Sequence, residues 1–220
     1  MFRKQFWNQM TTKVGTLALI VAAFVISIAG QATPVQLLKE GSLYQSADDT
    51  SDRAAIAYRL VIQKYPNSIQ AEQAQYFLGT YYEKKFFLVE GKSKVPDWSS
   101  FDQADQEFYS YVGKYRTKGT KSYLADSYFN LAMIALRRGY RNKDYRDTAN
   151  KLLTQMSEVA RQDSKVYVTK VVWTARSDDV VKKYCDTKSL ASATSTAINS
   201  ASSFDAAIRN LTAWSQSNCR

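Results

Sequence analysis

The feature that most constrains the fold is the stretch at residues 53–79, RAAIAYRLVIQKYPNSIQAEQAQYFLG. Ala54, Tyr58 and Val61 follow one another at steps of four and three. This spacing places a small, an aromatic and an aliphatic side chain on one face of a helix. The first half of the stretch is therefore predicted to be an amphipathic helix.

A turn signal divides this stretch in two. Pro66 cannot continue a helix, and it disfavours a helical backbone at the residue before it. Asn67 and Ser68 are favourable N-cap residues for a second helix. Gly79 lies within that second helix, where its lack of a side chain would let a neighbouring helix approach closely. We expect two consecutive helices joined by a tight turn.

The pattern recurs along the chain. A second copy has Ala104, Phe108 and Tyr111 at the same spacing, and it is followed by a predicted helix over residues 123–138. A weaker third copy has Ala149, Leu153 and Met156. Recurrence of one helical unit indicates a repeat architecture.

The repeated unit resembles the tetratricopeptide repeat (TPR). The resemblance rests on A-x3-Y-x2-V-x4-P at Ala54–Pro66, on LGTYY at Leu78–Tyr82 and on the YPNS turn between them. It looks most like the bacterial extracytoplasmic kind found in the Tol-Pal coordinating protein and in the lipoprotein of the β-barrel assembly machinery. It implies an all-α fold with a solenoid of helical hairpins over residues 51–165, and a groove that holds a peptide or helix.

The N-terminal segment, residues 1–32, has the features of a membrane-targeting leader. Three cations, Arg3, Lys4 and Lys13, precede an uncharged run of seventeen residues from Val14 to Gly30. At about 1.5 Å per residue this run is just long enough to span a bilayer as a helix. The segment is either an uncleaved transmembrane anchor or a signal peptide cleaved near Ala32.

The regions that flank the repeats have weaker patterns. Residues 33–50 are expected to be a connector containing a short helix that lies against the first repeat, with Ser51 or Asp52 capping the next helix. Residues 166–220 are expected to form a helical cap over the last repeat, because a helical stack needs its terminal face covered. The apolar run VYVTKVVW at 166–173 is interpreted as a buried helix.

An insert at residues 84–100 splits the repeat pattern and is unusually apolar. Phe86, Phe87 and Trp98 make it a candidate docking element, although folding back onto the core is the simpler interpretation. A helix is expected to begin at Phe101, capped by Ser99 or Ser100.

Aromatic and basic side chains supply the other candidate binding residues. Among the fifteen tyrosines, Tyr76 and Tyr123 are candidates for the groove, with packing between helices as the alternative role. The further groove candidates are Tyr58, Tyr82, Tyr109, Tyr111 and Tyr128. Two turns are basic, one around residues 114–121 and one around 137–146 that contains Arg137, Arg138 and Arg141. These cations would suit anionic lipid or wall polymer, or they would serve only to stabilise helix C-termini.

Cys185 and Cys219 are the two cysteines of the chain. In an oxidising compartment a disulfide between them would tie down the terminal helix, and two free thiols are the alternative.

Much familiar chemistry is missing from the sequence. The chain has no histidine and no glycine-rich phosphate loop, and its eight glycines are scattered singly. A Ser–His–Asp triad, a haem attachment motif and a Cys/His zinc site are therefore excluded. We expect no cofactor, no metal and no enzymatic activity.

Taken together, these features predict a membrane-anchored extracytoplasmic TPR-like adaptor that mediates protein–protein interaction within an envelope complex. Two alternatives stand beside it: an accessory structural subunit of a secretion, motor or respiratory machine, and a cell-wall-associated factor that binds anionic polymer. The net charge of +10 favours anionic partners. The expected location is the bacterial inner membrane with the bulk of the chain periplasmic, or the periplasm after cleavage near Ala32. That topology argues against nucleic acid as a partner.

Overall fold

The computed structural model describes residues 32–93, 95, 97–162, 167–171 and 182–219. In this part of the chain there are eight helices and two strands. The helices are α2 (Pro34–Ser46), α3 (Arg53–Lys64), α4 (Ile69–Ser93), α5 (Trp98–Tyr115), α6 (Lys121–Gly139), α7 (Lys143–Gln162), α8 (Thr187–Ser200) and α9 (Phe204–Asn218). The strands are β1 (Tyr167–Val171) and β2 (Lys182–Asp186). The expectation of a helical protein is confirmed for these residues, with one local exception in the two strands.

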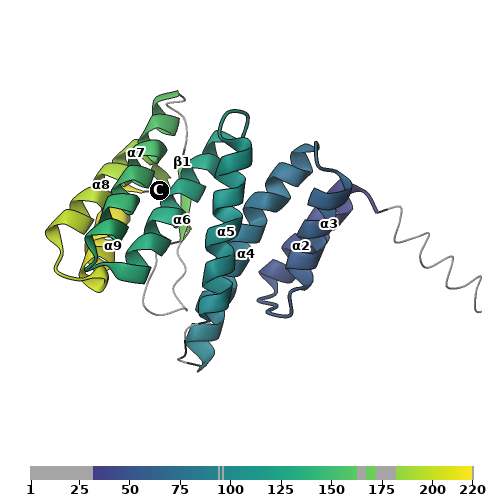
Figure 1. The fold of residues 1–220 in the computed structure, drawn as a ribbon, viewed down its shortest axis with the longest axis horizontal. Helices are drawn as coiled ribbons and strands as arrows, with labels where there is room; N and C mark the ends of the chain where they lie inside the picture. Colours follow the sequence, from purple (N-terminus) through teal and green to yellow (C-terminus); the bar gives the residue numbers. More distant parts are fainter. Residues whose placement is uncertain (1–31, 94, 96, 163–166, 172–181, 220) are drawn as a thin grey trace, which may run out of the picture.

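The helices form a stack of antiparallel pairs. Each helix from α2 to α7 packs against the next one along the chain, and α2 also contacts α4, as α4 contacts α6 (Figure 1). Contacts between alternate helices are what a row of stacked hairpins produces. The leader predicted at 1–32 lies outside the described residues, apart from Ala32. Among the residues described, no helix is long and apolar enough to cross a membrane.

The boundary between α3 and α4 follows the local signals in the sequence. α3 ends at Lys64, and the backbone N–H of its C-cap, Tyr65, donates to the carbonyl of Val61 over 2.9 Å. α4 begins just after Ser68, whose Oγ accepts a hydrogen bond from the N–H of Ala71 at 3.1 Å. The predicted stop at Pro66 and the predicted cap at Ser68 are both confirmed.

Glycines allow two of the hairpins to close tightly. A Cβ atom added to Gly79 of α4 would lie 2.6 Å from the ring of Phe108 on α5. Gly41 of α2 stands in the same relation to Tyr58 of α3, at 2.5 Å. Both aromatic rings are fully buried. The close approach expected at Gly79 is therefore confirmed, and the equivalent role of Gly41 was missed.

The predicted insert at 84–100 is mostly helical. α4 continues without a break to Ser93, and α5 begins at Trp98, three residues earlier than predicted. Asp97, and neither Ser99 nor Ser100, is the cap: its carboxylate accepts hydrogen bonds from the backbone N–H and the hydroxyl of Ser100, at 3.3 and 2.5 Å. The predicted cap was wrong because α5 begins at Trp98, so Ser99 and Ser100 lie inside its first turn and Asp97 takes the N-cap position.

The start of α3 also differs from expectation. Asp52 occupies the N-cap position, but its side chain makes no capping hydrogen bond. Its Oδ1 instead pairs with Nζ of Lys85 at 2.8 Å and accepts from the Tyr81 hydroxyl at 3.1 Å. Asp52 therefore links α3 to α4.

The apolar run predicted as a buried helix forms a strand over residues 167–171, the part of it that the structure describes. β1 pairs antiparallel with β2, with Tyr167 opposite Asp186 and Val171 opposite Lys182. β1 lies against α6, and β2 lies against α8 and α9. The local pattern of this short apolar run suits either a helix or a strand, and pairing with β2 decides in favour of a strand.

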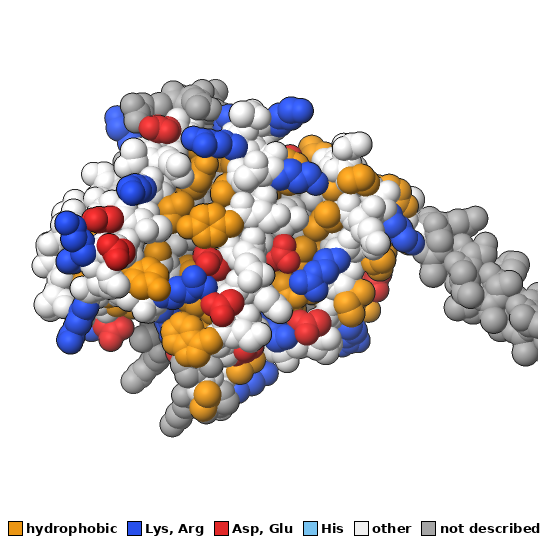
Figure 2. Space-filling view, viewed as in Figure 1, with side chains coloured by type: hydrophobic (Ala, Val, Ile, Leu, Met, Phe, Trp, Pro, Cys, Tyr) orange, Lys and Arg blue, Asp and Glu red, His pale blue; other side chains and the backbone are white. Residues whose placement is uncertain are grey.

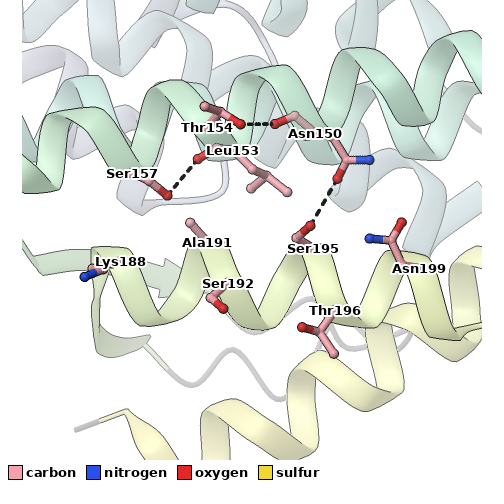
Figure 3. Close-up of a pocket in the computed structure, with 10 residues that line it drawn as sticks. All are labelled: Asn150, Leu153, Thr154, Ser157, Lys188, Ala191, Ser192, Ser195, Thr196 and Asn199. Atoms are coloured by element: carbon pink, nitrogen blue, oxygen red, sulfur yellow. Dashed lines mark hydrogen bonds between the residues drawn. The ribbon is translucent and has the colours of Figure 1, made fainter.

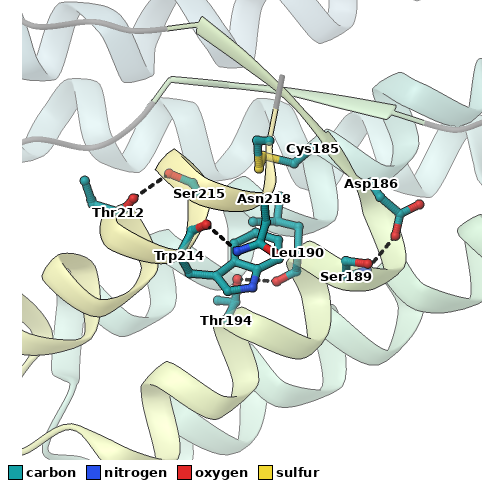
Figure 4. The surroundings of a disulfide bond; sticks show 10 residues. Cys185, Asp186, Ser189, Leu190, Thr194, Thr212, Trp214, Ser215 and Asn218 are labelled. Atoms are coloured by element: carbon teal, nitrogen blue, oxygen red, sulfur yellow. Dashed lines mark hydrogen bonds between the residues drawn. A yellow bond between two sulfur atoms is a disulfide. The ribbon is translucent and has the colours of Figure 1, made fainter.

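Two helices and a disulfide complete the C-terminal region (Figure 4). α8 packs against α7, and α9 packs against α8. Cys185 at the end of β2 is joined to Cys219 just after α9, with a Cα–Cα distance of 4.5 Å. The candidate cysteine pair is therefore bonded, and it fixes the end of α9 to β2.

Candidate protein-docking surface

The outward face of α5 carries a line of large and charged side chains. Trp98, Asp102, Asp105 and Tyr109 follow at steps of four, three and four, so they share one helix face. Trp98 and Tyr109 are each 47% exposed, which is high for aromatic residues. In Figure 2, hydrophobic side chains lie beside acidic and basic ones over the part of the molecule where α5 runs. We call these four residues, with Arg138, the α5 surface.

Trp98 is held by a packed aromatic base. Its ring lies 5.5 Å from that of Phe101 at a near-perpendicular angle of 81°, and 5.7 Å from that of Phe86. Phe86 and Phe101 are fully buried. One side of the indole therefore packs on the core while the other remains open to solvent, so little side-chain freedom is left to lose on binding.

Arg138 bridges the two carboxylates in the middle of the α5 surface. It reaches from α6, and its two terminal nitrogens lie 2.6 Å from Asp102 Oδ1 and 2.8 Å from Asp105 Oδ2. Burial raises the pKa of Asp105, and the guanidinium of Arg138 opposes that shift. The result is a fixed, nearly flat polar group between the exposed aromatic rings of Trp98 and Tyr109.

Arg137 has an internal role. Its guanidinium donates to both carboxylate oxygens of Glu90 on α4, at 2.6 and 2.8 Å. It also lies 4.9 Å from the ring centre of Phe86 and 5.4 Å from that of Phe87. Arg137 thus clamps the end of α6 to the end of α4 through an ion pair and cation–π contacts.

The structure brings five of the eight predicted binding residues into one region: Phe86, Phe87, Trp98, Arg137 and Arg138. Among the three aromatic residues of this region, Trp98 is the one whose side chain is exposed. Phe86 is inaccessible, and Phe87 is partly buried beneath Arg137. Arg141 lies apart, in the turn between α6 and α7, where it is exposed and makes no ion pair with a described residue.

Tyr76 and Tyr123 form a second cluster, between α4 and α6. Their rings are stacked, with centres 4.3 Å apart and planes 11° from parallel. The Tyr76 hydroxyl donates to Asp126 Oδ2 over 2.6 Å, and burial together with the Asp126 charge raises the pKa of Tyr76 well above its ordinary value. These contacts join helices of neighbouring hairpins, which is the packing role weighed against a groove role in the sequence.

An open polar groove of about 620 Å³ lies between α7 and α8 (Figure 3). Leu153 and Ala191 are its buried apolar members. Ser195 Oγ donates to Asn150 Oδ1 across it at 3.3 Å. The other lining residues are Thr154, Ser157, Lys188, Ser192, Thr196 and Asn199. These groups can form hydrogen bonds, and none of the ten described lining residues carries a carboxylate or thiol for acid–base or nucleophilic chemistry.

Within the described ranges, no three His, Cys, Asp or Glu side chains are grouped so that they could hold a metal ion. Comparisons of the chain with protein-family models, curated proteins and solved structures find no match.

Sequence reasoning missed the composition of the α5 surface. It placed Trp98 in an insert and Tyr109 among the groove tyrosines. Asp102 and Asp105 were not linked with Arg138, because the three meet only when α5 and α6 pack together. The one local signal was the spacing of residues 98, 102, 105 and 109.

Proposed function

We propose that this protein is a membrane-anchored extracytoplasmic adaptor of the TPR type that docks a protein partner within an envelope complex. The observation that carries the proposal is the α5 surface, where two half-exposed aromatic side chains flank an arginine fixed by two carboxylates. Trp, Tyr and Arg dominate the binding energy of protein interfaces when they sit on a pre-organised surface. The docking face in this proposal is the outer side of α5.

Two observations support an extracytoplasmic location. Disulfides persist in oxidising compartments, and Cys185 and Cys219 are bonded. The uncharged run Val14–Gly30, preceded by cations, has the composition of a membrane anchor whose basic flank stays in the cytoplasm.

The proposal is tested by placing a photo-crosslinking amino acid at position 98 of the full-length protein in its native membrane. We expect one defined protein to be captured. Trp98→Ala and Tyr109→Ala should each reduce co-purification of that protein by about tenfold or more, as hot-spot residues do. Tyr109→Ala tests the same surface without removing the aromatic packing beneath Trp98, so a loss of partner in this variant is not explained by loss of that packing.

Ile56→Ala is the matched control, since Ile56 on α3 is another large, exposed apolar residue. It should leave co-purification unchanged. Equal retention of the partner in all three variants would refute docking through the α5 surface.

A further inference from the structure

The turn between α3 and α4 and the turn between α5 and α6 lie at the end of the stack where α2 begins. The hydroxyl of Tyr65, after α3, donates to the backbone carbonyl of Ala32 over 2.8 Å. The backbone N–H of Thr120, before α6, donates to Glu72 in the first turn of α4 over 2.5 Å. Both turns are at the upper edge of the stack in Figure 1. We call this the leader-side end, because residues 1–31 join the stack there.

α2 starts firmly at this end. Thr33 and Gln36 form a reciprocal capping box, with hydrogen bonds of 2.8 and 3.2 Å, and Pro34 occupies the first helical turn. The uncharged run ends at Gly30, three residues before Thr33. Three residues span at most about 10 Å when extended. A bilayer that holds the run therefore lies close to the leader-side end.

Four exposed cations at the leader-side end have no acidic partner among the described residues. Lys64, Lys114, Arg116 and Lys118 are exposed there, and none forms an ion pair with a described residue. The acidic group closest in sequence to these turns, Glu72, is buried and accepts hydrogen bonds from the Tyr111 hydroxyl and the Thr120 N–H. In Figure 2, blue side chains lie along the upper edge and also lower on this face, whereas most red ones lie lower.

An apolar side chain stands among these cations. Ile69, the first residue of α4, is 62% exposed, and Pro66 before it is exposed as well. An exposed aliphatic residue beside several cations suits the headgroup region of a bilayer, where apolar groups insert and cations meet phosphate.

The opposite end of the stack has both paired and unpaired cations. There Lys84 pairs with Asp48, and Lys85 pairs with Asp52 at 2.8 Å. Arg137 and Arg138 are paired with carboxylates in the same region. These four cations are therefore neutralised, whereas Lys92, Arg141 and Lys143 at the same end are exposed and form no ion pair with a described residue. What distinguishes the leader-side end is that its unpaired cations lie next to the leader and beside Ile69.

We propose that the leader-side end is a contact surface for anionic phospholipid headgroups, which holds the stack against the membrane and turns the opposite end outward. This inference rests on the anchor in the proposed function. The estimated 10 Å reach is comparable to the Debye length of about 8 Å at physiological ionic strength, so the attraction acts across the gap. Lys64, Lys114, Arg116 and Lys118 bind the headgroups, and Ile69 enters the layer between them.

Lysine footprinting of the full-length protein tests the contact. The protein is placed in nanodiscs of phosphatidylcholine alone or with phosphatidylglycerol, acetylated, and analysed by mass spectrometry. We expect Lys64, Lys114 and Lys118 to react at least about threefold more slowly when phosphatidylglycerol is present, and high salt should remove the difference. Lys92 and Lys143, exposed at the opposite end, should react equally in both discs. Equal reactivity of the three leader-side lysines in both discs would overturn the proposal.

A charge-matched pair of variants separates a local contact from general attraction. Lys114→Glu, Arg116→Glu and Lys118→Glu together should abolish the protection of Lys64. Lys92→Glu, Arg141→Glu and Lys143→Glu change the net charge equally and should preserve it. Loss of protection in both variants would show that net charge alone matters, and retention in both would show that the three cations do not bind; either result rejects the assigned surface.

The anchor and the lipid contact fail in distinguishable ways. A chain that does not enter nanodiscs disproves the anchor, and its binding to phosphatidylglycerol vesicles then tests the surface by itself. Binding that is lost with the leader-side glutamates would support the surface without the anchor, whereas no binding would reject it. Partner capture through Trp98 depends on neither result.

Discussion

Gly79 lies against the ring of Phe108 so closely that a Cβ atom on the glycine would be 2.6 Å from two ring carbons. The neighbouring side chain is a buried ring that cannot move aside without disturbing the α4–α5 contact. We therefore expect Gly79→Ala to lower the free energy of unfolding by about 1–3 kcal/mol through overpacking. Urea denaturation of the purified protein measures the change.

Gly113→Ala is the control for this prediction. A Cβ atom there would meet nothing within 4 Å, and Gly113 lies within α5. Alanine should raise stability by about 0.5–1 kcal/mol, because it removes backbone freedom from the unfolded chain. A shift of the same sign in both variants would contradict the assigned packing.

Removing the hydroxyl of Tyr76 should weaken the contact between the second and third hairpins. Tyr76→Phe deletes the 2.6 Å hydrogen bond to Asp126, a carboxylate that is itself buried. We expect a loss of about 1–3 kcal/mol in the free energy of unfolding, the usual effect of depriving a buried polar group of a partner. Tyr109→Phe, on the exposed face of α5, should change it by less than about 0.5 kcal/mol. Equal effects would place the Tyr76 hydroxyl in solvent.

Loss of the disulfide should release the C-terminal helix first. Cys185 and Cys219 are 34 residues apart, and closing such a loop stabilises a fold by about 2–4 kcal/mol through its effect on the unfolded chain. The double variant Cys185→Ala and Cys219→Ala should lose a comparable amount. Hydrogen exchange should accelerate in α9 before it does in α3 or α4. Added reductant should reproduce this in the native protein and have no effect on the variant; uniform acceleration along the chain would contradict a local tie.

Stability should fall at alkaline pH. Burial raises the pKa of Tyr58 from 10.0 to about 12. The folded state then holds this proton more tightly than the unfolded state does, so the contribution is complete below pH 10 and is lost as the pH rises from 10 through about 12. We expect the urea midpoint to decline over this window. Tyr58→Phe should make the decline shallower, by up to about 1.4 kcal/mol per pH unit.

An unchanged slope in Tyr58→Phe would assign the alkaline loss to other tyrosines. Burial also raises the pKa of Tyr81 and of Tyr111. The Tyr81 hydroxyl donates a hydrogen bond to Asp52, and the Tyr111 hydroxyl donates one to Glu72.

Sequence reasoning succeeded where short-range chemistry decides the structure. The end of α3 and the start of α4 were predictable because Pro66 and Ser68 act within one turn of the backbone. The Gly79 contact followed from its place in a repeated pattern. The cap of α5 was harder to predict, since Asp97, Ser99 and Ser100 are all competent caps.

Features set by distant partners were not predictable. β1 is a strand because Lys182–Asp186 pairs with it, and its own apolar residues are compatible with either a helix or a strand. Arg138 looked like a cation available to an anionic ligand. Its acidic partners lie 33 and 36 residues earlier, and they reach it only through the packing of α5 on α6.

The order in which the helices pack determines how the stack would respond to pulling. A force applied at Ala32 enters through α2, whose main support is α3, and is then passed from each helix to its successor. Under such a force, the contacts between successive helices break one pair after another and not all together. At the far end, the Cys185–Cys219 disulfide ties the end of α9 covalently to β2. Mechanical unravelling would therefore start at the N-terminal hairpin and proceed toward a C-terminal region locked against it.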